Sequence, residues 1–310
     1  MVFTHVLYPT DLSEASLKAW PYAVALARGH QAQLTVLHVV PTFEPISVPS
    51  DDVASAYHTV HPPTPDDVRL EMQRAVTDVP LHGVEVRYLP HAGDPVRVIA
   101  DQAVSGSADL IVMGTHGRSG VERLLIGSVT ERVLRLAPCP VLAIPPHVPG
   151  VGAAEAVFAR ILCPVDFSPA SQEALGFAFA FARPAKGSVT VVHACEIADE
   201  PRLHAHLGEV QRQALDVARD KLRTLLADEP TTSGGIEQVV VLGRPGREIL
   251  KIASQQASDL IVMGAQGRGG VGLALVGSTT QDVVRGAVCP VLVVRIGAAL
   301  SGEGPDKTAS

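Results

Sequence analysis

Apolar residues form short unbroken runs along this chain, separated by stretches in which apolar residues recur at helical spacing. In the first half, the runs that we interpret as strands lie at about 3–9, 34–40, 83–89, 109–113 and 140–144. The stretches that we interpret as helices lie at about 14–28, 66–78, 95–105 and 124–136. The run "LIVM" is apolar at successive rather than alternate positions, so a strand there must be covered on both faces. This pattern predicts a parallel sheet between two layers of helices.

The second half shows the same order of runs. Its expected strands lie at about 159–165, 189–195, 237–242, 259–263 and 291–295. An apolar stripe along 210–226 predicts an amphipathic helix. Ser168 followed by Pro169 is a favourable helix start, because a proline at the first helical position needs no N–H partner. Pro21, by contrast, lies inside the first expected helix and should kink it.

One sequence segment occurs twice in the chain, with small differences. Residues 109–120 read "DLIVMGTHGRSG" and residues 259–270 read "DLIVMGAQGRGG", and other segments match at offsets of 150 to 155 residues. This is an internal repeat of domain length. We therefore expect two domains, at 1–147 and 157–296, joined by a linker at 148–156 and followed by a disordered tail at 297–310.

The alternation of strands and helices predicts the fold class of each domain. Strand–helix–strand units make right-handed crossovers and build a doubly wound, Rossmann-like α/β fold. We expect two tandem five-stranded parallel sheets with helices on both faces. Ligands of such sheets bind outside the carboxyl ends of the strands, where the strand order reverses. Residues that directly follow the strands are therefore the candidates for a site.

The fifth expected strand of each half is strongly apolar, reading "CPVLAIP" and "CPVLVVR". An apolar strand at the margin of a sheet exposes an edge that can pair with another strand. We expect the two domains to pack through these strands as a pseudo-twofold pair within one chain. Dimerisation of whole chains is left open.

Composition narrows the classes of function. The chain has 310 residues, of which 46% are apolar and 18% charged, and a net charge of -7 without any run of Lys or Arg. These values argue against binding to nucleic acid or to an anionic membrane. No apolar stretch reaches the ~18 residues of a membrane span, and the N-terminus lacks a secretory-signal pattern. The four cysteines lack C-x-x-C spacing, so we interpret them as buried apolar residues of a cytoplasmic protein.

Two pairs of histidines raise the question of a metal. His58 and His61 are three residues apart in a Pro-rich stretch, and His204 and His206 are two apart before an expected helix. Zinc prefers three or four convergent ligands, and no cysteine is near these pairs in sequence. We interpret them as solvated loop residues and expect no metal site.

Glycines follow the fourth expected strand of both halves at one spacing. The first half has Gly-x2-Gly-x9-Gly-Ser at Gly114, Gly117, Gly127 and Ser128, and the second half repeats it at Gly264, Gly267, Gly277 and Ser278. Such glycines can turn tightly and expose backbone N–H groups to an anion, and the Gly-Ser pair lies where a helix begins, whose positive end favours a phosphate. Plain turn formation is the alternative, but the recurrence favours phosphate binding.

Two familiar phosphate loops do not account for this spacing. No Gly in the chain is followed by Lys, so a P-loop is excluded. A G-x-G-x-x-G match at 267–272 follows the fourth strand rather than the first, and we interpret it as coincidental.

At these residues the chain resembles the universal stress protein family, in particular the tandem members of its ATP-binding branch. The resemblance covers both expected domains and rests on the glycine spacing, on "PTD" and "PVD" after the first strands, and on "HV" at the end of the second strand. It implies that each domain binds ATP, or ADP or AMP, together with Mg²⁺. It also implies a stress-response regulator whose protein partner the sequence does not identify.

The resemblance implies roles for particular residues. The adenosine would lie against residues that end the first two strands, which are Pro9, Thr10, Asp11, Val39, Pro164, Val165, Asp166 and Ala194. The remaining contacts would come from the glycine loops, through Met113, Gly114, His116, Gly117, Arg118, Gly127, Ser128 and Val129, and through Met263, Gly264, Gln266, Gly267, Arg268, Gly277, Ser278 and Thr279. Val165 lacks the hydroxyl of Thr10 and Gln266 lacks the imidazole of His116, so these departures should weaken the second site.

Simpler roles are open for some of these side chains. Asp11 and Asp166 could bond the local turn that follows each strand, and Ser128 and Ser278 could be plain helix caps. Catalysis of phosphoryl transfer would need a positioned nucleophile and a base, for which His116 is the one candidate. We therefore favour a binding module over an enzyme. Slow ATP hydrolysis, or autophosphorylation on Ser128, is the alternative.

Overall fold

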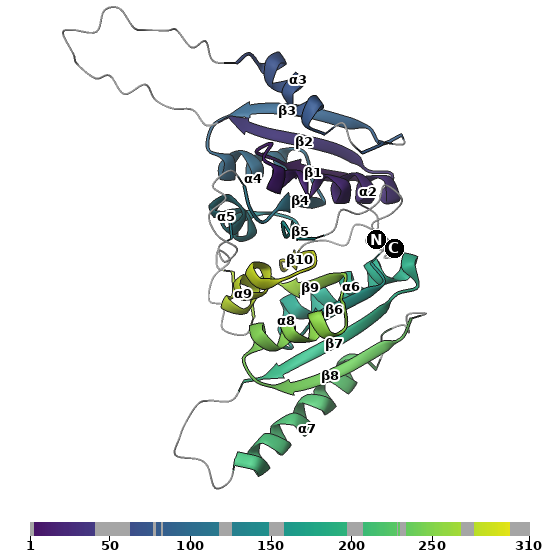
Figure 1. Ribbon diagram of the computed structural model, residues 1–310. Coiled ribbons are helices and arrows are strands. Elements are labelled where there is room, and N and C mark those ends of the chain that lie inside the picture. Colours follow the sequence, from purple (N-terminus) through teal and green to yellow (C-terminus); the bar gives the residue numbers. More distant parts are fainter. Residues whose placement is uncertain are drawn as a thin grey trace, which may run out of the picture.

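A computed structural model describes most of the chain in detail (Figure 1). The described residues are 3–40, 63–76, 79–81, 83–117, 126–148, 158–196, 207–227, 229, 234–267 and 276–297. The expected linker, beyond Val148, and the expected tail, beyond Gly297, lie outside the described residues.

The strands of both halves form one ten-stranded sheet (Figure 1). Its order is β3-β2-β1-β4-β5-β10-β9-β6-β7-β8. The strands of the first half are β1 (His5–Pro9), β2 (Gln33–Val40), β3 (Val86–Ala92), β4 (Leu110–Gly114) and β5 (Val141–Ile144). Those of the second half are β6 (Arg160–Pro164), β7 (Ser188–Cys195), β8 (Ile236–Leu242), β9 (Leu260–Gly264) and β10 (Val291–Val294). Each half is parallel and doubly wound, as expected.

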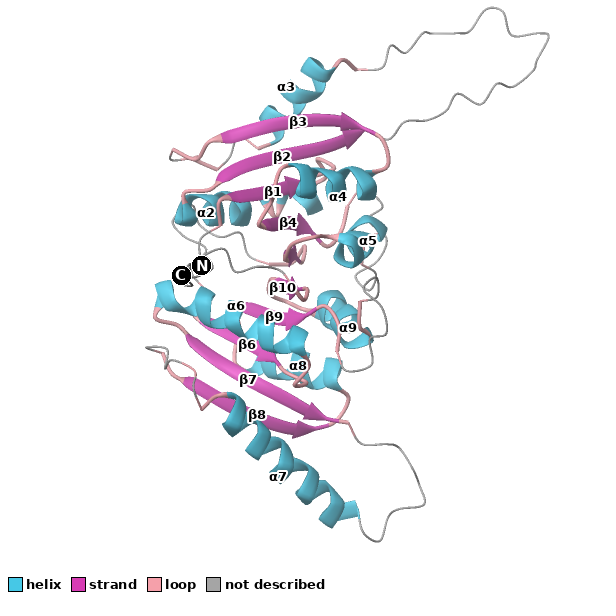
Figure 2. Cartoon of the chain, turned by 180° about the vertical axis from the view of Figure 1, so that it is seen from behind, coloured by secondary structure: helices cyan, strands magenta, loops and turns pink. Residues whose placement is uncertain are grey.

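Helices cover both faces of the sheet (Figure 2). One face is packed by α1 (Glu14–Leu17), α2 (Trp20–His30), α3 (Pro65–Ala75), α6 (Pro169–Ala185) and α7 (Leu207–Leu225). The other is packed by α4 (Pro95–Ser105), α5 (Ser128–Leu136), α8 (Pro245–Gln255) and α9 (Ser278–Gly286). Within β1, Val6 and Tyr8 belong to the first core and Leu7 to the second. Successive strand residues are thus buried on opposite faces, which explains the unbroken apolar runs.

Several expected elements differ in detail from the structure, and two of these differences have a clear local cause. The helix expected at 14–28 is two helices, because α1 ends at Leu17 and α2 begins at Trp20 with Pro21 in its first turn. Proline is tolerated there because its missing N–H is one that a helix start leaves unpaired. The third strand, expected at 83–89, is Val86–Ala92, since Gly83 has a positive φ of 87° and turns the chain first.

The halves meet through their fifth strands, as the apolar edges predicted. β5 and β10 pair antiparallel, with Leu142 opposite Leu292 and Val293 opposite Val141. Val293 is 1% exposed. Arg295, just after β10, donates hydrogen bonds to the carbonyls of Leu134 and Arg135 at the end of α5. The second half therefore contacts the C-terminal end of a helix whose N-terminal end faces the first candidate site.

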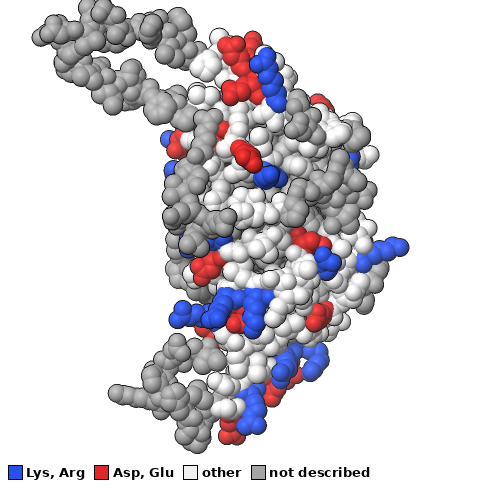
Figure 3. Space-filling view, viewed as in Figure 1, with Lys and Arg blue, Asp and Glu red and all other residues white. Residues whose placement is uncertain are grey.

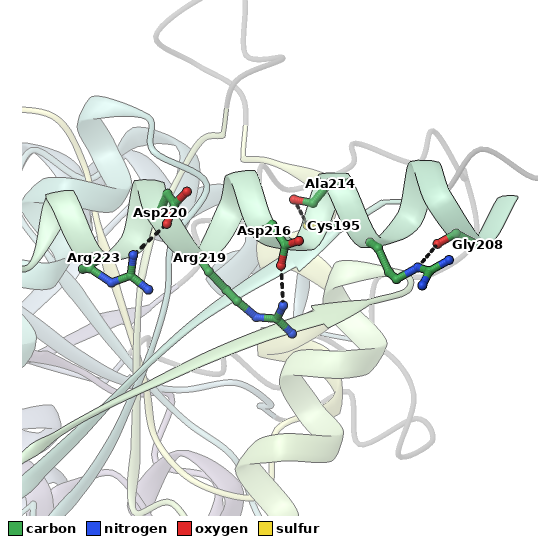
Figure 4. A network of polar contacts seen from close by, with 8 residues as sticks. Cys195, Gly208, Ala214, Asp216, Arg219, Asp220 and Arg223 are labelled. Atoms are coloured by element: carbon green, nitrogen blue, oxygen red, sulfur yellow. Dashed lines mark hydrogen bonds and ion pairs between the residues drawn. The ribbon is translucent and has the colours of Figure 1, made fainter. Parts of the chain in front are cut away.

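Surface charges are mixed in sign. On the face seen in Figure 3, acidic and basic side chains of the described residues are interspersed. Along α7, Arg219 pairs with Asp216 at 2.8 Å and Arg223 with Asp220 at 2.7 Å (Figure 4). Pairs three residues apart support an exposed helix by a few tenths of a kcal/mol each, roughly 0.2–0.5. None of the described helices is long and apolar enough to cross a membrane.

The cysteines are all free thiols, but they are not all buried. Cys139, Cys163 and Cys289 are buried, whereas Cys195 at the end of β7 is half-buried, 3.9 Å from the carbonyl oxygen of Ala214 (Figure 4). The interpretation of all four as core residues is therefore wrong for Cys195. Burial raises the pKa of the Cys139 and Cys289 thiols to about 12.

Candidate functional site

Each half has a cavity at the carboxyl edge of its strands, where the strand order reverses between β1 and β4 and between β6 and β9. The first cavity has a volume of about 320 Å³ and the second of about 770 Å³. Both volumes are within the range of small-molecule sites, roughly 300–1,000 Å³. The expected site residues in the first cavity are Pro9, Thr10, Asp11, Val39, Met113, Gly114, His116, Gly117, Gly127, Ser128 and Val129. Those in the second are Pro164, Val165, Asp166, Ala194, Met263, Gly264, Gln266, Gly267, Gly277, Ser278 and Thr279.

Two expected site residues, Arg118 and Arg268, lie outside the described residues. The same holds for the four histidines considered as metal ligands, His58, His61, His204 and His206, and for most of the G-x-G-x-x-G match at 267–272. No group of three or more metal-ligating side chains occurs among the residues that the structure describes.

The turn after β1 is built around Asp11. Its Oδ1 accepts a hydrogen bond from the backbone N–H of Ser13 at 3.1 Å and one from the Ser13 hydroxyl at 2.6 Å. Leu12 between them has a positive φ of 62°. Asp166 bonds Ser168 in the same way, at 3.0 and 2.6 Å. The local-turn role considered for these carboxylates is therefore present, and both also line the cavities.

A histidine from the second strand supports this turn in each half. His38 contacts the carbonyl oxygen of Thr10 through Nδ1 at 2.8 Å, and His193 contacts that of Val165 at 2.7 Å. Because a carbonyl only accepts, Nδ1 must carry the proton in this contact. This bond from the histidine to the turn was not predicted from the sequence, although a histidine stands at the same position of the second strand in both halves.

The Thr10 hydroxyl is engaged within the turn. Its Oγ1 lies 2.9 Å from the Ser16 hydroxyl and accepts a hydrogen bond from the N–H of Leu12 at 3.0 Å. In the second half, where Val165 replaces it, the Ser171 hydroxyl instead accepts from the N–H of Asp166 at 3.3 Å. The Thr-to-Val difference is thus largely accommodated inside the turn.

Three of the glycines lie in close packing that a side chain would disturb. A Cβ atom on Gly114 would lie 3.1 Å from the carbonyl oxygen of Ala15, and one on Gly264 would lie 2.9 Å from the carbonyl carbon of Ala170. A Cβ on Gly117 would overlap the carboxylate of Asp11. Glycine therefore lets the loop approach both the helix and the acidic turn.

The loop amides are used differently from our expectation. The N–H of Gly127 donates to the carbonyl of Thr115 at 2.8 Å, and that of Gly277 donates to the carbonyl of Ala265 at 2.9 Å. These two amides close the loop, so they are not among the backbone N–H groups that the glycine turns were expected to expose.

The starts of α5 and α9 supply other donors. The first hydrogen bond of α5 runs from the N–H of Glu131 to the carbonyl of Gly127 at 3.0 Å. The amides of Ser128, Val129 and Thr130 precede it, and these are the amides that a helix start offers to an external acceptor. α9 begins in the same way, with Gln281 bonded to Gly277 at 3.0 Å.

A buried threonine fixes each of these helix starts to the sheet. Thr130, 3% exposed, donates its hydroxyl hydrogen to the carbonyl of Gly114 at 2.9 Å. Thr280 does the same to Gly264 at 2.9 Å. Neither residue was predicted from the sequence, although a threonine two positions after the Gly-Ser serine in both halves could have indicated them.

The opposite end of each cavity is apolar. In the first cavity it is formed by Leu37 and Val39 of β2 and by Pro95 and Ile99 of α4. His116 lies on the loop side, with Nδ1 2.9 Å from the Thr115 hydroxyl. The cavity therefore offers a helix start at one end and an apolar wall at the other.

This fold and these cavities define a tandem, doubly wound α/β protein with a cavity at the strand ends of each half. The universal stress protein family model matches residues 3–145 and 158–295. The chain therefore belongs to the universal stress protein family, through both of its halves.

Individual relatives agree with this assignment. The universal stress protein Rv2005c of Mycobacterium tuberculosis is 33% identical over 195 residues, which are 62% of this chain and 63% of that protein. The match thus spans just under two thirds of that relative. The universal stress protein Rv2623 of the same organism is 28% identical over 94% of this chain and 96% of its own length. A solved universal stress protein from Archaeoglobus fulgidus has 24% identity and a TM-score of 0.63, covers 94% of this chain and 98% of its own, and shows the shared fold.

Proposed function

We propose that each half of this chain binds one adenine nucleotide, and that nucleotide occupancy alters surfaces that a partner recognises during stress. The observation that carries the proposal is the convergence of the expected residues, from four separate segments of each half, on one cavity at the same edge of the sheet. The domains would be those expected from the sequence, 1–147 and 157–296.

In the proposed binding mode the phosphates lie at the starts of α5 and α9. The donors would be the amides that precede the first helical hydrogen bond, such as those of Ser128 and Val129, with the Ser128 hydroxyl beside them. The positive end of a helix contributes roughly 0.3–1 kcal/mol toward a nearby anion, and more where the site is partly buried.

The base would lie at the apolar end, against Val39 and Ile99. The strand order places β1 between β2 and β4, so their carboxyl ends lie two strand spacings apart, roughly 10 Å. A ligand with an apolar head at β2 and an anionic tail at the start of α5 has to span that distance. A nucleoside phosphate has this length and polarity.

Mg²⁺ fits the donors that line the cavities. It is usually held by one or two carboxylates together with substrate phosphates, and the turn after the first strand of each half supplies one carboxylate to its cavity, from Asp11 or from Asp166. When bound, the ion would neutralise phosphate charge next to these carboxylates. We therefore propose that ATP binds with Mg²⁺.

We propose binding rather than turnover as the main activity. The base candidate, His116, lines the first cavity, but Gln266 stands at its position in the second. Slow hydrolysis or autophosphorylation on Ser128 is the competing proposal for the first half. Steady release of labelled γ-phosphate that disappears in a Gly127→Val variant would favour that alternative.

A thermal-shift series with single-glycine variants tests the binding proposal. Ligand at about 100 times its Kd stabilises a folded protein by about 2.7 kcal/mol per site, so ATP with Mg²⁺ should raise the melting temperature. Gly117→Ala and Gly267→Ala should each reduce that rise, because the new Cβ meets the carboxylate of Asp11 or, at 2.5 Å, that of Asp166.

The matched control is Gly29→Ala in α2, where a Cβ would meet nothing within 4 Å. It should keep the full ATP response. Equal responses in all three variants would contradict the proposed sites.

The cellular setting is also a proposal. The four free cysteines suit a reducing compartment, and we keep the cytoplasm as the expected location. Nucleotide occupancy would then be recognised by unidentified protein partners or would change the dimerisation of the whole chain.

A further inference from the structure

We infer that the two cavities differ in base specificity, and that the second accepts adenine nucleotides with a substituent on the exocyclic amine whereas the first excludes them. The residue that makes the difference is Ala194, in place of Val39. This inference rests on the proposed function, because it concerns which nucleotide each site takes.

Val39 and Ala194 occupy the same place in the two halves. On β2, Leu37 pairs with the last residue of β1, and on β7, Val192 pairs with the last residue of β6. Val39 and Ala194 each lie two residues beyond that point. Each also follows the histidine that bonds the turn, His38 or His193.

The two strand ends differ in how closely they are packed. Val39 is only 9% exposed, and His38 before it is buried. The last three residues of β7, from His193 to Cys195, are all half-buried. Ala194 lacks the two methyl groups of valine, so the apolar end of the second cavity is both wider and less covered.

The second cavity continues beyond this position. Its lining includes Cys195 and Glu196, whereas the described lining of the first cavity on β2 stops at Val39. This extension agrees with the larger volume, about 770 Å³ against 320 Å³. The second site therefore has room past the base, in a part of the cavity lined by Ala194, Cys195 and Glu196.

The chemistry of that extension selects the edge of the base that faces it. The phosphates are fixed at the start of α9 by its leading amides, so the base points toward the end of β7. The Glu196 carboxylate accepts hydrogen bonds, and the donor edge of adenine carries the exocyclic amine. A substituent on that nitrogen keeps one N–H for the carboxylate and places its apolar part beside Ala194.

Calorimetric stoichiometry of the full chain tests this inference, with ATP and N6-benzyl-ATP as the probes. ATP should bind at two sites per chain and N6-benzyl-ATP at one. Ala194→Val should weaken N6-benzyl-ATP relative to ATP by about tenfold or more, since one or two methyl-sized groups in an apolar pocket change selectivity by roughly 10–200-fold. Val39→Ala is the reciprocal change and should open a second N6-benzyl-ATP site.

The outcomes separate this inference from the function on which it rests. If ATP does not bind, both fall. If ATP binds and N6-benzyl-ATP binds with the same stoichiometry, or not at all, the proposed function stands and the difference between the sites is refuted. An Ala194→Val chain with an unchanged affinity ratio would also refute it.

Discussion

At the scale of single residues, Asp11 shows how one side chain can serve both fold and site. One carboxylate oxygen is engaged by Ser13, which shapes the turn after β1, while the other lies against Gly117. A carboxylate beside a polyphosphate is repelled unless a cation or a hydroxyl donor lies between them. We therefore expect Asp11 to contact the ribose or Mg²⁺ and not the phosphates directly.

Thr130 gives the sharpest prediction at this scale. Replacement by valine keeps the shape but removes the hydroxyl that donates to the Gly114 carbonyl. Leaving a buried acceptor unpaired costs roughly 1–3 kcal/mol, so the free energy of unfolding should fall by about that amount. ATP should also bind more weakly in the first half, because the start of α5 is no longer fixed to β4.

Thr130→Ser is the control for that experiment, since it restores the hydroxyl. Urea unfolding and ATP titration of both variants provide the measurements. If the valine variant binds ATP with the same affinity as the unmodified chain, Thr130 does not position the start of α5 for binding.

The repeated glycines, found from their spacing, and strand-terminal residues such as Thr10 and Val39, implied by the resemblance, line common cavities. Their role in binding a nucleotide stays a prediction. The partner of each hydrogen-bonding group could not be predicted from sequence spacing. The N–H of Gly127 closes its own loop, and the roles of Thr130 and His38 depend on which carbonyl each side chain reaches in three dimensions.

At the scale of elements, the seam between β5 and β10 joins the two halves. Val293→Lys would place an ammonium group in a position that is 1% exposed and opposite Val141. Burial of an unpaired charge is strongly unfavourable, so we expect loss of several kcal/mol of stability and separation of the halves. Small-angle scattering should then report a larger radius of gyration.

Val288→Lys is the matched control, because Val288 is 63% exposed just before β10. It should change neither stability nor size. An equally compact Val293→Lys chain would contradict the seam.

An aromatic contact predicts how stability depends on pH. His30, at the end of α2, lies edge-on against Phe3 with ring centroids 4.7 Å apart, and burial lowers the pKa of its imidazole. The unfolded chain then binds more protons near the ordinary histidine pKa of about 6.5, so stability rises with pH through that region and is lost as pH falls. His30→Phe should flatten this part of the profile relative to the unmodified chain.

Measurement of the unfolding midpoint in urea between about pH 5 and pH 8 checks this, because the range spans the ordinary histidine pKa. A profile that His30→Phe leaves unchanged would show that this imidazole does not titrate differently on folding.

Most elements could be predicted from apolar runs because a buried parallel strand leaves an unmistakable pattern. The residues at which helices and strands begin and end were harder to predict. Pro21 was expected to kink one helix, whereas it lies in the first turn of a second helix, and the short helix before it, α1, packs against β4.

At the scale of the whole molecule, the two halves are repeats that are not equivalent. Arg295 of the second half reaches the C-terminal end of α5, where cations are favoured by the helix dipole. The corresponding residue of the first half is Pro145, which carries no charge. Arg295 therefore bonds the end of α5 from across the seam, and Pro145 has no charged side chain with which to make the equivalent contact to the end of α9. The repeat was evident from the sequence, but this contact was not, because it depends on how the two halves of the sheet join.

The central claim is that each half binds an adenine nucleotide at its strand edge. Isothermal titration of the nucleotide-free full chain with ATP and Mg²⁺ tests it most directly. Two binding events per chain, each accompanied by protection against heat, are the predicted result. A titration without heat, together with an unchanged melting temperature, would contradict the account and leave a duplicated fold with two unexplained cavities.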